Sequence, residues 1–321
     1  MNEYLKLLTL ERGDRRIRLR SPAKVNLFLE PLRKRADGYH EIVTVMQTID
    51  LCDELEIELV GTGIELECDN PKLPRGPENL AYRAAEAFAG ATRLEQGVRI
   101  RLSKRIPVGG GLGGGSGNAA VTLLGLNELA GRPLSRRRLA RIATLLGSDV
   151  SFFLYGGTAL CRGRGERVKP LKPAPEFWLM LVTAPINIST RVVYGRVNLS
   201  LTRRHSVRRM LRSINDSDVR ALCDSLHNGL AGAVLAEHPP LEQLWREVTE
   251  QGLPCSQLSG SGSTLYGVCC TGAEATELKQ RLRCRLPGDV FVAVARNRLA
   301  PVKENGDADH RGEDQPEGGR Q

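Results

Sequence analysis

The sequence predicts an α+β fold, and three observations carry this prediction. Alternating apolar and polar residues recur through the first hundred residues, which is the period of half-buried strands. Helical patterns at 116–131 and 135–146 then follow one another without a strand between them. Strand, helix and strand patterns return at 265–270, 273–286 and 289–296. Strands and helices are therefore partly segregated along the chain, as in α+β folds.

The clearest strand pattern covers residues 21–30. Ala23 and Val25 share one face of this segment, while Lys24 and Asn26 project from the other. We therefore expect a half-buried strand that presents a cation and an amide on its second face.

The other elements follow from the same periodicities and from turn residues. In the first half we expect an edge strand or loose arm at 1–20, a strand at 42–49, a hairpin of 53–60 with 63–68, a helix at 78–90 ending at Gly90, and a strand at 97–102. The second half begins near Val168, with a strand at 177–183, helices over 203–213 and 217–250, and a glycine-serine turn at 259–264. The tail from Pro301 is polar, and we expect it to be disordered.

Composition narrows the class of protein. The 321 residues are 41% hydrophobic and 26% charged, as in ordinary soluble proteins. No apolar stretch approaches the roughly 18 residues that span a bilayer, and the first residues lack a secretory pattern, so we expect a cytoplasmic protein with no membrane partner. Eight cysteines without a CxxC pair indicate reduced thiols rather than a zinc site or disulfides.

A net charge of +9 favours anionic partners. Arginine runs at 136–141 and 203–212 have apolar residues interleaved at helical spacing, so we interpret them as solvated helix faces. Neither run has an aromatic-rich stretch or a nucleic-acid motif beside it. We therefore expect no nucleic-acid partner, and the sequence leaves the oligomeric state open.

The segment 107–117 holds seven glycines among eleven residues. Glycines let backbone N–H groups approach a ligand closely, and the free N–H groups of the helix that follows suit a phosphate. A linker or tight turn is the alternative, but a linker would not run directly into a strong helix. We therefore expect this glycine loop to bind phosphate.

Common phosphate-binding loops of other kinds do not fit this segment. A P-loop needs a Gly-Lys pair, which the chain lacks, and the HRD and DFG signatures of protein kinases are also absent. Gly109, Gly111 and Gly114 satisfy the dinucleotide pattern GxGxxG, but that pattern alone is weak. The residues SKRIP separate the glycines from the preceding strand, and a second helix replaces the strand that a dinucleotide fold requires.

Lys24 and Asp149 are candidate chemical groups for phosphoryl transfer to an alcohol. That reaction needs a group that accepts the hydroxyl proton and a charge that neutralises the moving phosphoryl group. Asp149 lies in GSDVSFF between a helix and a short apolar segment, where it could equally cap that segment. Lys24 could equally be an exposed strand lysine.

Three segments resemble the GHMP kinases. The glycine loop resembles their PxxGLGxS element, SPAKVNLFL with RADGYHE resembles the N-terminal signature of one branch, and GSDVSFFLYGG resembles the aspartate motif of that branch. The resemblance implies a GHMP kinase fold, with a ribosomal-S5-like ATP-binding domain at 1–170, a ferredoxin-like α/β domain at 171–300, and a disordered tail at 301–321. The implied activity is ATP-dependent phosphorylation of a small alcohol.

The resemblance also implies roles for individual residues. Lys24 and Asp149 would be the catalytic pair. ATP, as co-substrate, would contact Pro107, Val108, Gly109, Gly110, Gly111, Leu112, Gly113, Gly114, Gly115, Ser116 and Gly117, with Asn79 and Lys104 nearby. Mg²⁺ is implied by the chemistry, and Ser116 is the expected side-chain ligand. A third glycine motif, which by itself could be a helix-to-strand turn, would lie near the phosphates and comprises Ser259, Gly260, Ser261, Gly262 and Ser263.

Tyr39 and His40 follow a predicted turn. Such an aromatic pair can stack on a base or hydrogen-bond its edge, or it can simply cap a hairpin. In the resembled branch these residues hold a cytosine, and the resemblance places Tyr194 opposite them, with Asn26 and Thr190 beside the same ligand. The implied substrate is a cytidylyl alcohol of the non-mevalonate route to isoprenoid precursors.

Two other functions compete with this one. A GHMP kinase for another alcohol, such as homoserine or mevalonate, would not need the aromatic pair. A non-catalytic, basic RNA-binding protein would show steep salt dependence and no ATP turnover. The chain also departs from the resembled branch at Gly117, where a serine is usual, at Ser151, which replaces a proline, and at 227–230, which lacks an Asn-Asp-Leu-Glu pattern.

Overall fold

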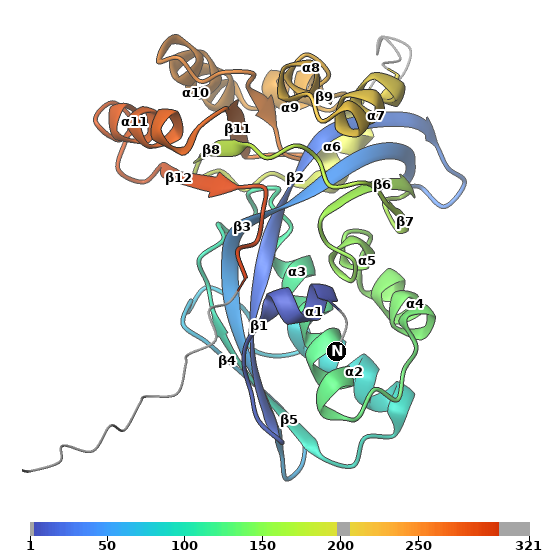
Figure 1. Cartoon of the computed structure of the whole chain (residues 1–321). Coiled ribbons are helices and arrows are strands. Elements are labelled where there is room, and N and C mark those ends of the chain that lie inside the picture. The colour runs from blue at the N-terminus through green and yellow to red at the C-terminus, as the bar shows by residue number, and fades with distance from the viewer. Residues whose placement is uncertain (1–2, 198–205, 302–321) are drawn as a thin grey trace, which may run out of the picture.

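A computed structural model describes residues 3–197 and 206–301 of the chain. Two β-sheets form its framework, and helices pack on both of them (Figure 1). Within the described residues the first sheet has eight strands and the second has four. The mixture of largely antiparallel sheets and separate helical layers confirms the predicted α+β class.

The first sheet is built around two long strands, β2 (Arg16–Lys34) and β3 (His40–Val60), which pair antiparallel along most of their length. The path runs β1-β2-β3-β5-β4, with β6 beside β3, β7 beside β6, and β9 beside β2. The remaining members are β1 (Thr9–Arg12), β4 (Ile64–Cys68), β5 (Gly97–Ser103), β6 (Thr158–Gly163), β7 (Arg167–Pro170) and β9 (His227–Asn228). The predicted strands 21–30 and 42–49 lie inside β2 and β3. The expectation that 21–30 is half-buried is wrong, because both faces of this segment are buried.

The predicted hairpin of 53–60 with 63–68 is wrong, because β5 lies between these two strands. Both strands carry glutamates at alternate positions, which would face one another across a hairpin. Arg99 and Arg101 of β5 separate them and pair with both sides. The nitrogen–oxygen distances are 3.3 Å from Arg99 to Glu58, 2.8 Å from Arg99 to Glu65, 2.6 Å from Arg101 to Glu56 and 3.2 Å from Arg101 to Glu67. Opposite charges on neighbouring strands favour this order.

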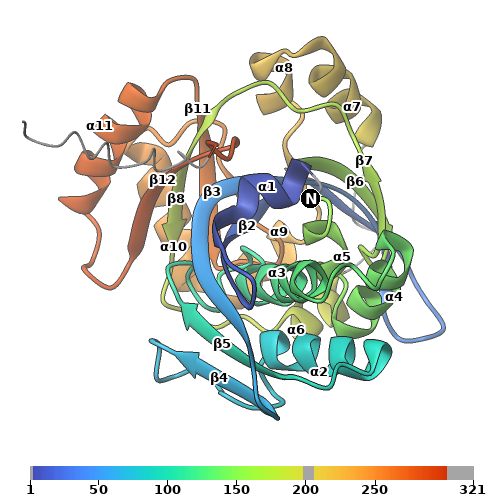
Figure 2. The ribbon, with the colours of Figure 1, turned by 60° about the horizontal axis from the view of Figure 1, so that its bottom comes forward.

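Helices α2 and α3 lie on one face of the first sheet, and α4 and α5 pack against them (Figure 2). The helices of this half are α1 (Glu3–Leu8), α2 (Leu80–Thr92), α3 (Gly114–Leu129), α4 (Arg136–Leu146) and α5 (Val150–Phe153). Two sequence expectations are wrong here. The segment 1–20 contains a helix and not only a strand or arm, and α2 continues past Gly90 until Arg93, which adopts the left-handed conformation with φ 55°.

The second sheet is antiparallel, in the order β10-β11-β8-β12. Its strands are β8 (Trp178–Thr183), β10 (Gln257–Leu258), β11 (Thr264–Cys269) and β12 (Phe291–Arg296). The helices of this half are α6 (Thr190–Arg196), α7 (Val207–Asp216), α8 (Val219–Cys223), α9 (Ala231–Glu237), α10 (Pro239–Glu250) and α11 (Gly272–Arg283). The expectation that 217–250 is helical is only partly correct, because β9 interrupts it to pair with β2.

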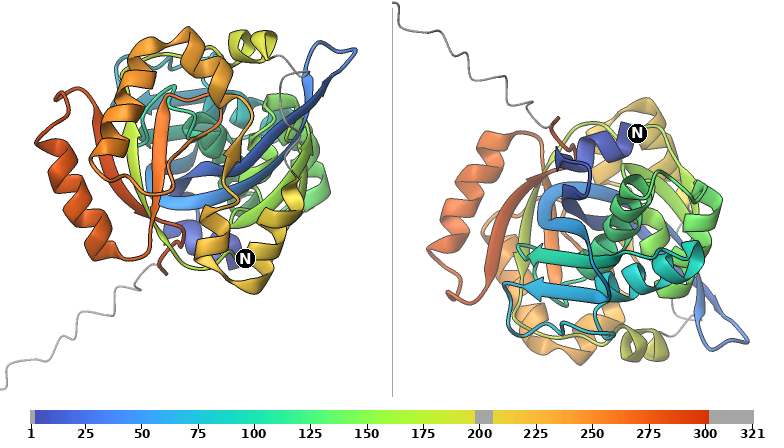
Figure 3. Two further views of the ribbon diagram at one scale, coloured as in Figure 1. Left: turned by 90° about the horizontal axis from the view of Figure 1, so that it is seen from above. Right: turned by 90° about the horizontal axis from the view of Figure 1, so that it is seen from below.

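Successive side chains of β8 point to opposite faces of the second sheet, and those on one face pack against the first sheet. Met180 and Val182 point into the core beneath α10 and α11, which lie on the outer side of the second sheet (Figure 3). Leu179 and Leu181 point the other way and pack in one core with β2 and β3 residues such as Phe28. The two sheets therefore share a buried core, and the segments on either side of it are held in fixed positions.

The predicted division of the chain at residue 170 stays a prediction. Most of the arginine-rich helix expected at 203–213 is present as α7, while residues 203–205 lie outside the described part of the chain. The tail expected to be disordered lies almost wholly outside it too, since only Pro301 is described. Across the described residues, none of the helices combines the length and the apolar character that crossing a membrane requires.

Candidate active site

Two cavities meet at the glycine loop. The larger, of about 770 Å³, extends from the loop to Tyr39, His40 and Tyr194, while the smaller, of about 370 Å³, lies along the loop itself. Five residues line both cavities: Gly111, Gly113, Ser116, Thr190 and Ser261. Ligands bound in the two cavities would therefore approach each other at these residues.

The glycine loop lines the smaller cavity with residues 107–116. Gly109, Gly111 and Gly113 have φ between 72° and 75°, a conformation that other residues rarely adopt. At Gly111 a β-carbon would lie only 2.2 Å from the carbonyl oxygen of Ser259. The loop thus needs glycine both for its backbone conformation and for its close approach to the third glycine motif.

Gly117 lines neither cavity. A β-carbon there would meet the hydroxyl of Ser21 at 2.9 Å and the carbonyl oxygen of Pro22 at 3.0 Å. The position faces β2 rather than the glycine-loop cavity. A side chain at residue 117 would therefore start out against β2, so the departure at Gly117 does not alter the wall of that cavity.

Lys24 is buried on β2, directly beneath the loop. Its Nζ donates hydrogen bonds of 2.8 Å to the carbonyl oxygen of Gly111 and of 2.8 Å to Asn26 Oδ1. Asn26 in turn donates to the Thr44 hydroxyl at 2.9 Å, which fixes the amide. The interpretation of Lys24 as an exposed strand lysine is therefore wrong.

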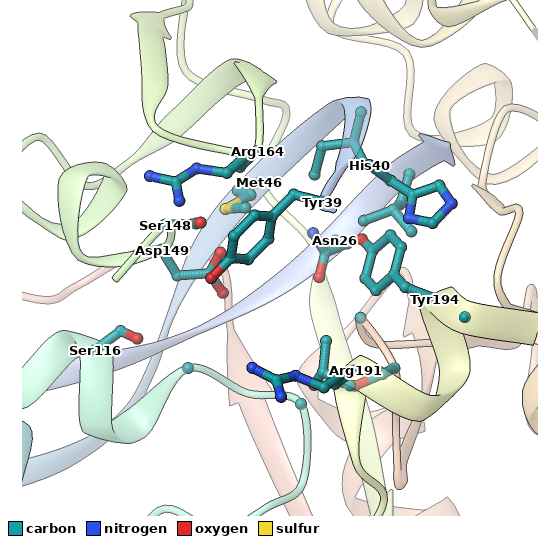
Figure 4. A pocket seen from close by; sticks show the side chains of 18 of the residues that line it. Asn26, Tyr39, His40, Met46, Ser116, Ser148, Asp149, Arg164, Arg191 and Tyr194 are labelled. Carbon is teal, nitrogen blue, oxygen red and sulfur yellow. The ribbon is translucent and has the colours of Figure 1, made fainter. Parts of the chain in front are cut away.

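The structure brings Asp149 to Lys24, although 124 residues separate them. Asp149 Oδ2 lies 3.6 Å from Lys24 Nζ, and the carboxylate side chain is 30% exposed at the wall of the larger cavity. Asp149 occupies the residue before α5, but its side chain makes no capping hydrogen bond. The carboxylate is therefore not used as a helix cap and remains available to a ligand (Figure 4).

The third glycine motif lies where the two cavities meet, and it directly precedes β11 of the second sheet. Ser259 donates its hydroxyl to the carbonyl oxygen of Gly111 at 3.0 Å, and Ser261 shares a hydrogen bond of 2.9 Å with Thr190. Gly262 lines the smaller cavity. Ser263 faces away from both cavities and donates to a backbone carbonyl 2.7 Å away. The motif thus contributes Gly260, Ser261 and Gly262 to cavity walls, while Ser259 and Ser263 hold its backbone.

The far end of the larger cavity is aromatic. The rings of His40 and Tyr194 lie 5.4 Å apart between centroids, and Arg164 stacks on Tyr39 with its Cζ 4.8 Å from the ring centroid. Burial, reinforced by the charge of Lys34, lowers the pKa of His40, so its imidazole is neutral near pH 7. Burial, with the Asp149 carboxylate as a weaker cause, raises the pKa of Tyr194 and keeps its hydroxyl protonated.

Asn79 and Lys104 line the smaller cavity but also have structural partners. Asn79 Oδ1 accepts from the Ala81 N–H at 2.9 Å and so caps α2. Lys104 forms an ion pair with the buried carboxylate of Asp53. Their contact with a nucleotide stays a prediction, as do the ligand roles of the other residues in these two cavities.

Several residues of the site were not expected from the sequence, and four of them are polar groups with a clear place in it. Arg164, Arg191 and Ser148 line the larger cavity, and none of them belongs to a glycine or aromatic motif. Asn228 is buried and donates from Nδ2 to the carbonyl oxygens of Leu258 at 2.8 Å and of Gly260 at 2.7 Å, which fixes the third glycine motif. The one sequence signal noted in this segment is that residues 227–230 lack the acidic Asn-Asp-Leu-Glu pattern.

The residues present fit a magnesium ion that a nucleotide brings with it. In residues 3–197 and 206–301 no group of three histidines, cysteines or carboxylates could hold a metal alone. Ser116 lines both cavities, and the nearby Asn118 Oδ1 is buried without a hydrogen-bond partner in the described structure. Mg²⁺ commonly takes few protein ligands and relies on phosphates and water for the rest.

Comparisons with known proteins identify the family. Residues 79–157 match the model of the GHMP kinases N-terminal domain. The chain is 41% identical over 251 residues, which is 78% of its length and 87% of theirs, to 4-diphosphocytidyl-2-C-methyl-D-erythritol kinases of Bacillus mycoides (strain KBAB4) and Bacillus cereus (strain AH187). These relatives bear out the resemblance to GHMP kinases that the motifs indicated.

Solved structures give the same result. A crystal structure of 4-(cytidine 5'-diphospho)-2C-methyl-D-erythritol kinase has 34% identity and a TM-score of 0.74, covering 87% of this chain and 98% of its own. A homoserine kinase from Cytophaga hutchinsonii, at 17% identity and a TM-score of 0.68 over 89% of this chain and 96% of its own, shares the fold. By its sequence and its fold, the chain belongs to the 4-diphosphocytidyl-2-C-methyl-D-erythritol kinase family of the GHMP kinases.

Proposed function

We propose that this protein transfers the γ-phosphoryl group of ATP to the position-2 hydroxyl of 4-diphosphocytidyl-2-C-methyl-D-erythritol, in the non-mevalonate route to isoprenoid precursors. The protein is an ATP-dependent small-molecule kinase, and the family supplies the identity of the alcohol. The observation that carries the proposal is the pair Lys24–Asp149, at 3.6 Å, beside the junction of two cavities.

The two cavities divide the substrates. ATP occupies the smaller cavity, with its phosphates on the N–H groups of the glycine loop and of the first turn of α3. The cytidylyl alcohol occupies the larger cavity, with its base between the aromatic side chains and its alcohol near Asp149. The γ-phosphoryl group and the hydroxyl then meet at the residues that line both cavities.

Asp149 accepts the proton of the attacking hydroxyl. The hydroxyl oxygen forms a bond to the γ-phosphorus, the bond from that phosphorus to the β-γ bridging oxygen breaks, and ADP leaves. A carboxylate that is partly exposed, makes no capping bond and lines the cavity is suited to accept that proton.

Lys24 positions the reacting groups. Its ammonium group has three donors, of which two are used by Gly111 and Asn26, so the third can be shared by Asp149 and a phosphoryl oxygen. Because these fixed partners hold the side chain, its charge is in place before the substrates bind.

The aromatic end recognises cytosine. Tyr39 and Tyr194 offer flat faces, and stacking on a base contributes about 1–3 kcal/mol. A neutral imidazole both donates and accepts, and the lowered pKa of His40 therefore suits the edge of a base.

Mg²⁺ accompanies ATP in this proposal, and Ser116 is the side chain that would contribute an oxygen to it, with Asn118 as a second candidate. The ion neutralises charge on the β- and γ-phosphates. Metal identity, a cytoplasmic location, and the division of the chain into an ATP-binding half and a second half at residue 170 stay predictions.

The proposal is tested by ADP release in a coupled assay with ATP and Mg²⁺. We expect release to depend on the cytidylyl alcohol and to be absent, or far slower, with homoserine or mevalonate. Equal rates with homoserine or mevalonate would assign the larger cavity to another alcohol. An ADP release rate that does not change when any of the three alcohols is added would refute the proposal that this protein phosphorylates alcohols of this class.

A further inference from the structure

Arg191 is a cation in the larger cavity that has no assigned task. It lies in the first turn of α6, lines the larger cavity, and directly follows Thr190, which lines both cavities. Its side chain is exposed to that cavity, and within residues 3–197 and 206–301 it takes part in no hydrogen bond or ion pair. A free guanidinium group at a cavity wall can bind an anion without first losing a partner.

The larger cavity carries an excess of positive charge. Its charged lining residues are two carboxylates, Asp37 and Asp149, and four cations, Lys24, Lys34, Arg164 and Arg191. Asp37 already pairs with Arg35 at 2.8 Å, and Asp149 lies beside Lys24. The remaining cations therefore favour a ligand that carries negative charge.

The ligand places its negative charge between its two ends. In a cytidylyl alcohol the groups follow in the order base, ribose, diphosphate and alcohol. With the base at Tyr39 and Tyr194 and the alcohol at Asp149, the diphosphate must cross the middle of the cavity. Each of its two phosphates carries one negative charge, which costs free energy in a cavity unless a cation meets it.

Arg191 is the cation best placed to meet the diphosphate. It stands three residues before Tyr194 on α6, so both side chains leave the same face of that helix. Figure 4 shows its guanidinium group extending from α6 toward the glycine loop, while Tyr194 points into the cavity above it. Arg164 is held over the ring of Tyr39, and Lys24 is held by Gly111 and Asn26.

We propose that Arg191 binds the diphosphate of the cytidylyl substrate and thereby sets the preference for a diphosphate-linked alcohol over a free alcohol. The planar guanidinium group can donate two parallel hydrogen bonds to phosphate oxygens, which a lysine cannot. This inference rests on the proposed function. The γ-phosphate of ATP is the other anion within the site, and the experiment below separates the two.

The test measures dissociation constants of the three ligands cytidine, CMP and CDP, and separately that of ATP, by titration calorimetry for wild type, Arg191→Gln and Arg191→Lys. Arg138→Gln, which removes an exposed arginine of α4 that lines neither cavity, is the matched control. We expect Arg191→Gln to weaken CDP roughly tenfold to hundredfold, CMP less and cytidine not at all, as for a lost charged hydrogen bond. Arg191→Lys should recover part of the loss, and the control should match wild type.

Other outcomes overturn the inference in distinguishable ways. Unchanged CDP affinity in Arg191→Gln, with wild type binding all three ligands, removes Arg191 from the diphosphate and leaves the proposed function intact. An equal loss for cytidine and CDP would place its effect at the base. A raised ATP dissociation constant with unchanged CDP binding would assign the guanidinium group to ATP. Wild type that binds none of the three ligands would overturn the proposed function and this inference together.

Discussion

The two cavities recognise their ligands by different means. One wall of the smaller cavity is glycine backbone, because the glycines of residues 109–115 leave N–H groups where side chains would otherwise stand. The larger cavity is walled largely by side chains, among them the aromatic rings, Lys24, Asp149 and Arg191. Backbone recognition suits a phosphate chain that many kinases share, and side-chain recognition suits the alcohol that distinguishes one kinase from another.

The two cavities also differ in what a single substitution changes. In the smaller cavity a substitution acts through backbone conformation and close contacts. In the larger cavity a substitution removes one chemical group and leaves the backbone as it is. The four predictions below use this difference, from the largest expected effect to the smallest.

Asp149→Asn tests the point where the two regions meet. We expect kcat to fall by roughly 10² to 10⁴, because the amide cannot accept the proton, while the dissociation constant of ATP stays close to that of wild type. Steady-state kinetics and nucleotide titration give the two quantities. Turnover close to that of wild type would remove Asp149 from the role of proton acceptor.

Gly111→Ala tests the backbone-walled region. The substitution forces a β-carbon onto a residue at φ 73° and to 2.2 Å from the Ser259 carbonyl oxygen, so the loop must shift. We expect a loss of about 2 kcal/mol or more in stability, and ATP affinity at least about tenfold weaker. Thermal unfolding and ATP titration measure both.

Gly90→Ala is the matched control for Gly111→Ala. Gly90 lies inside α2 with open space around its α-carbon, and alanine is the better helix former there. Its stability should rise slightly, and its ATP affinity should not change. If both variants behave alike, the conformational requirement at Gly111 is refuted.

Tyr39→Ala tests the side-chain-walled region. Removing the stacking face should weaken the cytidylyl substrate by about 1–3 kcal/mol, roughly tenfold to hundredfold in KM, without changing ATP affinity. Tyr155→Ala is the control, because Tyr155 carries a similarly stacked arginine, Arg136 at 4.4 Å, but lines neither cavity. An unchanged KM for the substrate in Tyr39→Ala would take this ring out of the base site.

His40 gives the smallest effect, on pH dependence. Burial lowers its pKa in the folded protein, so unfolding takes up a proton as the pH falls below the unfolded value of about 6.5. Its contribution to stability is therefore complete above that value and declines on acidification. The gap in unfolding temperature between wild type and His40→Gln should narrow from pH 7.5 to pH 5.5. A gap that widens would contradict the sign of the shift.

Local patterns predicted the strands that matter most for the site. Alternation from 21 to 30 already placed Lys24 and Asn26 on one face of a strand, and β2 bears this out. The hairpin expected at 53–68 failed because no local pattern reveals that β5, from 97–103, lies between the two strands. Pairing partners distant in sequence depend on charges such as those of Arg99 and Arg101, which can be assigned only once the strands are adjacent.

The same distinction applies to the site. Glycines at 109–115, the turn before Tyr39 and the segment around Asp149 are motifs in which the chemistry lies within a few neighbouring residues. Arg191 and Asn228 belong to no such motif. Their positions in the site depend on α6 lying beside the glycine loop and on β9 pairing with β2.

The sequence by itself determined the glycine loop, the strand that carries Lys24, the aromatic pair and the family, because each depends on contiguous residues whose conformation is set locally. Only the tertiary structure decided that Asp149 reaches Lys24, that Gly117 turns toward β2, and that Arg191 lines the larger cavity. Those facts depend on how two sheets share one core, and packing of that kind is fixed by contacts among residues far apart in the chain.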